Sequence, residues 1–123
     1  MSRMRVVIFE DEPIIAADIQ QAVEDASCVV CGIFSDSSAA EAIYAEIKPD
    51  LAIVDLHLMD GDTGADLAHY LHQQGCEIVV FSATRPADAR LCSISHTYIG
   101  KPLSPYLLTQ ALRPNQIEPV RFN

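Results

Sequence analysis

The chain has 123 residues, half of them apolar, and a formal net charge of −9. A chain of this length is predicted to form one domain, residues 1–123, with a C-terminal tail from about residue 114 onward. Its eight basic residues are scattered, which argues against nucleic acid as a partner, because phosphate binding depends on clustered lysine and arginine. No apolar run approaches the length of a membrane span and no secretory signal is recognisable, so we expect a cytoplasmic protein that does not enter a membrane.

Five short apolar runs recur along the chain, each separated from the next by about twenty residues, which is room for one helix and two loops. Most of them are rich in valine and isoleucine without clean alternation, a pattern typical of strands that are buried on both faces. The predicted strands are Val6–Phe9, Val29–Phe34, Leu51–Val54, Ile78–Phe81 and Tyr98–Ile99.

The segments between these runs carry apolar residues at helical spacing. Proline at position 13 suits a first helical turn, and Gly75 is a suitable stop for the third helix. The predicted helices cover residues 13–26, 38–47, 65–74, 87–93 and 104–112. The resulting β-α order, repeated five times with right-handed crossovers, predicts an α/β fold with a doubly wound, five-stranded parallel sheet.

Charged or hydroxyl-bearing residues stand at the carboxyl ends of four predicted strands. They are Glu10 and Asp11 after the first strand, Asp55 after the third, Ser82 after the fourth and Lys101 after the fifth. In a sheet of this kind, ligands bind outside the carboxyl ends of the strands, where the winding reverses. We therefore expect these five side chains to converge on one site.

This set of residues is suited to phosphoryl chemistry with a divalent metal. Several carboxylates in one cleft need a counter-charge, and Mg²⁺ (or Mn²⁺) supplies it while preferring oxygen ligands. Lys101 adds a positive charge for a phosphate oxygen, and Ser82 offers a hydroxyl donor. With the metal bound, the charges sum to zero, and a phosphoryl group on Asp55 would disturb that balance enough to bias a switch.

Four segments of the chain, in order, resemble the receiver domain of two-component response regulators. They are Val7–Pro13, Asp50–Leu58, Val79–Ala83 and Tyr98–Pro102. The resemblance implies a flavodoxin-like fold and a single-domain response regulator rather than an enzyme. Such a protein accepts a phosphoryl group from a histidine kinase or a histidine phosphotransfer protein, and then signals to a downstream protein target. We expect a monomer or a weak dimer.

The resemblance also implies which residues hold the metal and the phosphoryl group. Asp55 corresponds to the phosphoacceptor and Asp11 to the direct metal ligand. Glu10 would act on the metal through a water molecule, and the backbone carbonyl of His57 would be a further protein ligand.

Further roles follow from the same resemblance. Ser82 and Lys101 correspond to the hydroxyl and the lysine that contact the phosphoryl group. Tyr98 corresponds to the aromatic residue that moves inward together with Ser82 on activation. His57 and Thr84 occupy positions that tune the rate of dephosphorylation by controlling the access of water.

The chain departs from the family pattern after the phosphoacceptor. Met59 stands where a proline is usual, Gly61 and Gly64 flank the usual position of a glycine, and the stretch from Ser82 to Lys101 is short. These departures leave open a second hypothesis, in which a vestigial receiver acts as a non-phosphorylated protein-interaction module.

A third hypothesis is a metal-dependent phosphohydrolase on a similar sheet. Such enzymes typically carry two aspartates, two residues apart, after the first strand. Here Asp11 is followed two positions later by Pro13, so this pattern is not met.

Overall fold

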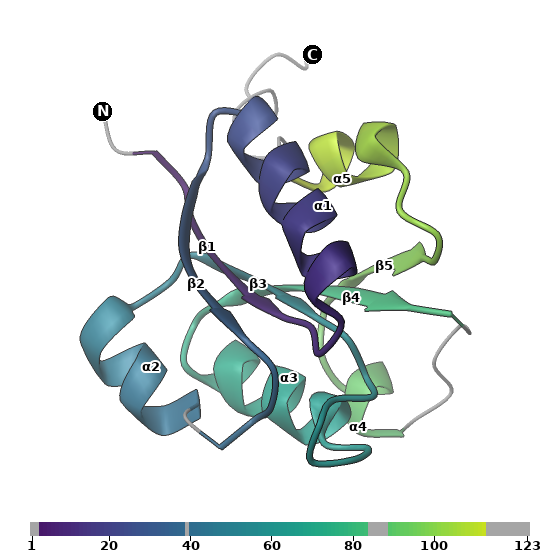
Figure 1. The fold of residues 1–123 in the computed structure, drawn as a ribbon. Coiled ribbons are helices and arrows are strands. Elements are labelled where there is room, and N and C mark those ends of the chain that lie inside the picture. Colours follow the sequence, from purple (N-terminus) through teal and green to yellow (C-terminus); the bar gives the residue numbers. More distant parts are fainter. Residues whose placement is uncertain (1–2, 39, 84–88, 113–123) are drawn as a thin grey trace, which may run out of the picture.

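The computed structural model describes residues 3–38, 40–83 and 89–112 (Figure 1). Its strands, in chain order, are β1 (Arg5–Phe9), β2 (Val29–Phe34), β3 (Leu51–Val54), β4 (Glu77–Ser82) and β5 (Thr97–Gly100). All pair in parallel, in the spatial order β2-β1-β3-β4-β5. The predicted five-stranded parallel sheet is therefore confirmed, and its winding reverses between β1 and β3.

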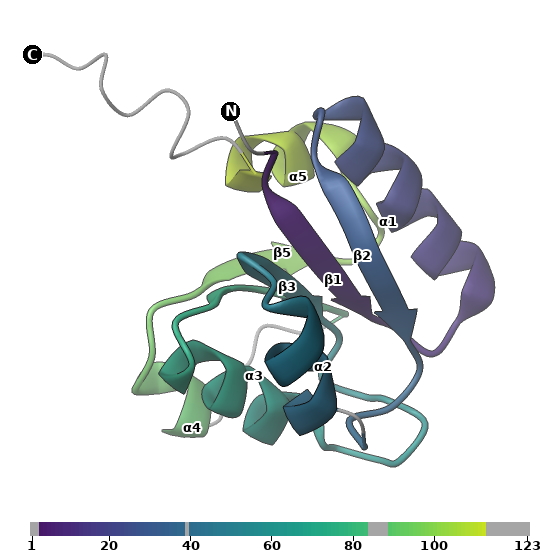
Figure 2. The same ribbon diagram turned by 90° about the vertical axis from the view of Figure 1, so that its left-hand side faces the viewer.

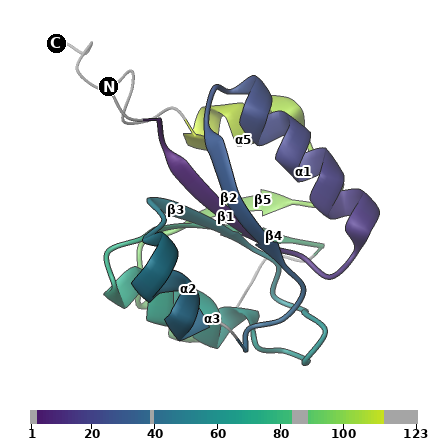
Figure 3. The ribbon, with the colours of Figure 1, turned by 60° about the vertical axis from the view of Figure 1, so that its left-hand side comes forward.

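Helices cover both faces of the sheet, as the three ribbon views show (Figures 1, 2 and 3). One face carries α1 (Pro13–Asp25) and α5 (Pro105–Leu112). The other face carries α2 (Ala40–Ile47), α3 (Gly64–Gln73) and α4 (Ala89–Cys92). Among the described residues, no helix combines the length and the apolar character needed to cross a bilayer.

The fourth helix is predicted over residues 87–93. Within the described residues α4 spans residues 89–92, so the predicted helix is present and ends one residue earlier than predicted. Residues 84–88, which include Thr84, lie outside the described residues, as does the predicted tail from residue 114.

Two cores fill the spaces between the sheet and its helices. Because successive side chains of a strand point to opposite faces, consecutive residues of the central strands serve different cores. Leu51 and Ile53 of β3 face α1 and α5, while Ala52 and Val54 face α2, α3 and α4. This explains why the predicted strands lack clean alternation of apolar and polar residues.

Burial on both faces holds for the central strands β1, β3 and β4 but is wrong for the two edge strands. Most of β2 is half-buried and Ile33 is exposed, while β5 begins with the exposed residue Thr97. Each edge strand has a neighbouring strand along one edge, so its other edge is not covered by the sheet.

Candidate functional site

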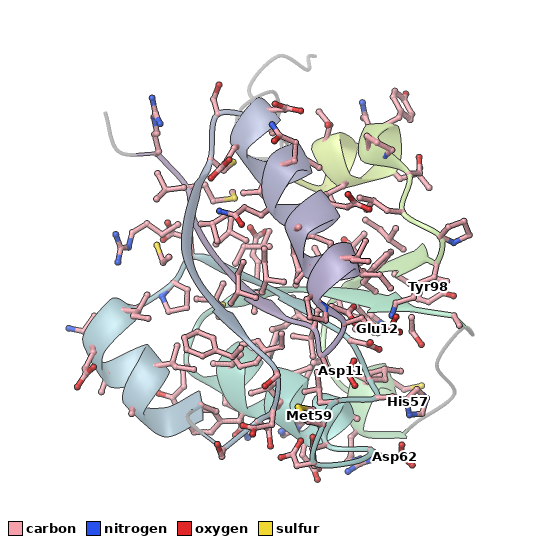
Figure 4. The ribbon with its side chains drawn as sticks, in the orientation of Figure 1. Asp11, Glu12, His57, Met59, Asp62 and Tyr98 are labelled. Atoms are coloured by element: carbon pink, nitrogen blue, oxygen red, sulfur yellow. The ribbon has the colours of Figure 1, made fainter. Side chains whose placement is uncertain are left out.

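The carboxyl ends of β1 and β3 bring three carboxylates together. Asp55 directly follows β3, and its backbone N–H donates to the carbonyl of Phe9 at 3.0 Å, which ties the two strand ends to each other. Carboxylate oxygens of Glu10, Asp11 and Asp55 all lie within 4.8 Å of one another. Figure 4 shows Asp11 at this edge of the sheet, on the same side as His57.

Two of these carboxylates are buried. Glu10 is 3% exposed and Asp55 is 5% exposed, whereas Asp11 is half-buried. Burial raises the pKa of Glu10 to about 7, and the charge of Asp55 adds to the rise. Adjacent buried carboxylates disfavour each other's ionised form unless a cation relieves them. A cation bound beside these carboxylates would therefore stabilise their ionised forms.

Lys101 provides part of that charge. Its Nζ donates to Asp55 Oδ2 at 2.9 Å and lies 3.2 Å from Glu10 Oε1. Burial alone would lower the pKa of Lys101, but the hydrogen bond and charge of Asp55, together with Glu10, outweigh it and hold the pKa above its ordinary value. The ring of Phe81 lies 5.3 Å from the ammonium group. Lys101 thus contacts two of the three carboxylates, and one ammonium charge is too little to balance the cluster.

The donor set fits a hard divalent cation. Glu10 Oε1 is buried and lies 3.2 Å from Lys101 Nζ, while its Oε2 accepts the N–H of Glu12 at 3.2 Å. Mg²⁺ prefers carboxylate oxygens and retains several waters, which a half-buried Asp11 can accommodate. The residues at this edge are therefore chemically suited to hold Mg²⁺ or Mn²⁺.

The backbone of His57 lies beside Asp55, and its N–H donates to Asp55 Oδ1 at 3.2 Å. The His57 side chain is exposed, and its Nδ1 lies 2.6 Å from Asp62 Oδ1. Figure 4 shows both side chains near the outer end of the loop that follows β3. The predicted metal contact of the His57 carbonyl and the rate-tuning role of its side chain stay predictions.

Ser82, the last residue of β4, is in contact with Tyr98, the second residue of β5. The hydroxyl of Ser82 is fully buried and has no hydrogen-bond partner among the described residues. The Ser82 carbonyl accepts the N–H of Lys101 at 3.0 Å and the hydroxyl of the half-buried Tyr98 at 3.1 Å. Buried hydroxyls normally have a hydrogen-bond partner. The Ser82 hydroxyl is therefore available to donate to an acceptor that enters the site. Thr84, the remaining predicted residue, lies outside the described residues.

The role of Gly64, the first residue of α3, was not predicted from the sequence. A Cβ atom added there would lie 2.2 Å from the carbonyl oxygen of Asp55 and 2.5 Å from Leu56 Cα. The start of α3 therefore packs directly against the peptide that carries Asp55. A glycine at the start of a predicted helix was the available signal, because glycine otherwise disfavours helices.

Asp60 was also missed. Its Oδ1 accepts the Thr63 hydroxyl at 2.6 Å, and its Oδ2 accepts the Ser37 hydroxyl at 2.7 Å. Ser37 is 23 positions away in the sequence, so this contact could not be predicted from a local sequence pattern.

Comparison with known proteins gives consistent matches. Residues 6–113 match the response regulator receiver domain. The phyllosphere-induced regulator PhyR of Methylorubrum extorquens is 34% identical over 82 residues, which are 66% of this chain and 31% of that protein. The chain therefore spans about a third of the length of this relative.

Solved structures agree with this match. The response regulator PhyR from Brucella abortus is 29% identical, with a TM-score of 0.74, over 97% of this chain and 53% of that one. The signal receiver domain of a modulated diguanylate cyclase from Desulfovibrio desulfuricans G20 has a TM-score of 0.81 over 95% of this chain and 99% of that one. At 22% identity, the second comparison shows the shared fold alone.

Proposed function

Because the chain belongs to the response regulator receiver domain family, we propose that it is a phosphoacceptor switch in which Asp55 accepts a phosphoryl group beside a bound divalent metal. The position of Asp55 carries this proposal. Asp55 is a buried carboxylate that lies next to two others and pairs with the ammonium group of Lys101 at 2.9 Å. Positioning and charge stabilisation are what phosphoryl transfer demands of a protein.

The proposed reaction is a displacement at phosphorus. A carboxylate oxygen of Asp55 attacks the phosphoryl group of a phosphohistidine on a histidine kinase or a histidine phosphotransfer protein. The new P–O bond forms as the P–N bond breaks, and the imidazole nitrogen keeps the electron pair. Mg²⁺ or Mn²⁺, when bound, supplies charge stabilisation for the phosphoryl oxygens.

The residues of the site take separate roles in this proposal. Asp11, Asp55 and the His57 carbonyl hold the metal directly. Glu10 acts through a water molecule, which suits its deeper burial and its contact with Lys101. Lys101 then pairs with a phosphoryl oxygen, which draws its ammonium group away from the carboxylates.

The switch follows from the same contacts. A phosphoryl group on Asp55 offers an acceptor for the hydroxyl of Ser82, which has no partner among the described residues. Movement of Ser82 changes the position of Tyr98, because the Tyr98 hydroxyl donates a hydrogen bond to the Ser82 carbonyl. The surface near β5 then changes for a downstream protein target, while His57 and Thr84 set how fast water removes the phosphoryl group.

The test is the metal-dependent labelling of Asp55. Wild-type protein and the Asp55→Asn variant are incubated with acetyl phosphate, with Mg²⁺ or with a chelator, and their intact masses are compared. The proposal predicts one added phosphoryl group on the wild-type protein when Mg²⁺ is present. It predicts none on the wild type with the chelator, and none on Asp55→Asn under either condition. Equal labelling of Asp55→Asn would show that another residue is the acceptor.

The same samples address the interaction-module hypothesis. A vestigial receiver would show neither labelling nor changes in the amide chemical shifts near Asp11 and Asp55 when Mg²⁺ is added. A working phosphoacceptor shows both.

A further inference from the structure

The loop between β3 and α3 (residues 55–63) is fastened to the loop between β2 and α2 (residues 35–38) by the carboxylate of Asp60. Asp60 Oδ2 accepts both the N–H and the hydroxyl of Ser37, at 3.3 and 2.7 Å. Asp60 Oδ1 accepts the hydroxyl of Thr63 at 2.6 Å. The Thr63 and Ser37 hydroxyls lower the pKa of Asp60, which favours the ionised carboxylate that accepts these bonds.

Backbone hydrogen bonds reinforce the same connection. The N–H of Met59 donates to the Ser35 carbonyl at 2.9 Å, which joins the two loops a second time. Leu58 and Gly61 exchange hydrogen bonds of 2.9 and 3.0 Å, which close the tip of the β3–α3 loop on itself. The loop is therefore held at its tip and on its flank.

Hydrogen bonds restrain the backbone on both sides of His57. Its own N–H donates to the Asp55 side chain, and Met59 and Asp60, which follow it in the chain, are bonded to the β2–α2 loop. A peptide group held in this way has little freedom left to lose when it binds a ligand. Ordering it during folding, rather than during binding, favours affinity.

We propose that Asp60 is a positioning residue for the metal site, because it fixes the loop that carries the His57 carbonyl before a metal binds. This inference rests on the proposed function, since the His57 carbonyl is a metal ligand only if that proposal holds. Asp60 itself does not touch the metal. Its effect passes through Ser37, Thr63 and the loop backbone.

The first test compares the affinity for Mg²⁺ of wild-type protein, Asp60→Asn and Asp66→Asn, measured from amide chemical shifts. Asp66 is an exposed carboxylate in the first turn of α3 that pairs with Arg90, so its loss removes the same charge without loosening the loop. We expect Asp60→Asn to weaken Mg²⁺ binding about tenfold, the scale of a lost outer-shell partner. An equal loss in both variants would reduce the effect to long-range charge and overturn the inference.

The second test leaves the charge unchanged. Thr63→Ala removes the donor to Asp60 Oδ1, while Thr63→Ser retains a hydroxyl. The inference predicts weaker Mg²⁺ binding in Thr63→Ala and affinity close to that of the wild type in Thr63→Ser. Because Asp60 keeps its Ser37 contacts in these variants, they also serve if Asp60→Asn does not fold.

Hydrogen exchange of the Met59 amide gives a readout without metal. Exchange should be faster in Asp60→Asn and Thr63→Ala than in the wild type, because the bond to Ser35 opens more often. Unchanged exchange and unchanged Mg²⁺ affinity would overturn the inference while wild-type labelling of Asp55 still supports the proposed function. Wild-type protein that binds no Mg²⁺ would instead overturn both.

Discussion

Glu10 shows how one buried residue links the site to the stability of the chain. Its neighbours are Asp55, which opposes its ionisation, and Lys101, which favours it. Burial and Asp55 outweigh Lys101, so the pKa rises to about 7 in the folded protein. In the unfolded chain the group returns to its ordinary pKa of 4.5. The folded state therefore binds the proton more tightly than the unfolded state does.

This difference predicts how stability depends on pH in metal-free protein. Stabilisation by protonated Glu10 is fully present below the unfolded pKa and is lost as pH rises through the folded pKa. From about pH 5.5 to about pH 8, the free energy of unfolding should fall by roughly 2 kcal/mol more in the wild type than in Glu10→Gln. Urea unfolding with a chelator present measures this difference. Parallel pH profiles for the two proteins would contradict the prediction.

Substitution of Ser82 should affect the stability of the protein and its phosphorylation in different ways. Its buried hydroxyl has no partner among the described residues, so Ser82→Ala removes an unsatisfied polar group rather than a hydrogen bond. The variant should be as stable as the wild type or more stable by about 1 kcal/mol. Phosphorylation by acetyl phosphate should nevertheless slow, because a donor to the phosphoryl group is lost. A stability loss comparable to that of a broken buried hydrogen bond would show that the hydroxyl is already paired.

At the scale of elements, the placement of Asp55 depends on how α3 meets β3. The N–H of Gly64 donates to the Leu56 carbonyl at 3.1 Å, and the absence of a side chain lets the two backbones approach. Asp55 is also tied to β1 through Phe9. Asp55 is thus held from the strand side and from the helix side.

Gly64→Ala should disturb this arrangement. The new Cβ would meet backbone atoms of Asp55 and Leu56, which cannot move aside as a flexible side chain could. We expect a loss of about 2–3 kcal/mol in the free energy of unfolding, together with weaker Mg²⁺ binding. Gly61→Ala is the matched control, because its Cβ would meet nothing within 4 Å and its cost, about 1 kcal/mol, comes from its φ of +106°. Equal losses in chemical denaturation would show that close approach at Gly64 is unimportant.

Elements with a strong local signal were predictable from the sequence. The predicted bounds of β2 and β3 match the observed bounds, because short runs of apolar residues between turn residues mark strands directly. The convergence of Glu10, Asp11, Asp55 and Lys101 followed from the rule that parallel strands end at one edge. Contacts between distant loops, such as that of Asp60 with Ser37, depend on the folded geometry and leave no periodic trace. The fourth helix was predicted over residues 87–93, and α4, residues 89–92, lies within that range.

At the scale of the whole molecule, the fold concentrates negative charge at one edge of the sheet. Three carboxylates from two strand ends face one ammonium group, in a chain whose net charge is already −9. Folding brings Asp55 next to Glu10 and Asp11, whereas the unfolded chain keeps Asp55 apart from them. A cation that binds this cluster binds the folded state in preference to the unfolded state, and it must therefore stabilise the entire domain.

Addition of Mg²⁺ should accordingly raise the Tm of the wild type. At a free concentration about 100-fold above the dissociation constant, the gain in the free energy of unfolding is about 2.7 kcal/mol. Asp11→Asn should lose most of this gain. Its own cost without metal should be small, because Asp11 is half-buried. Sodium chloride of matched ionic strength controls for screening, which acts on exposed charges throughout the chain. A Tm increase of the same size with sodium chloride, or in Asp11→Asn, would mean that Mg²⁺ acts on the surface at large and not on the cluster at the ends of β1 and β3.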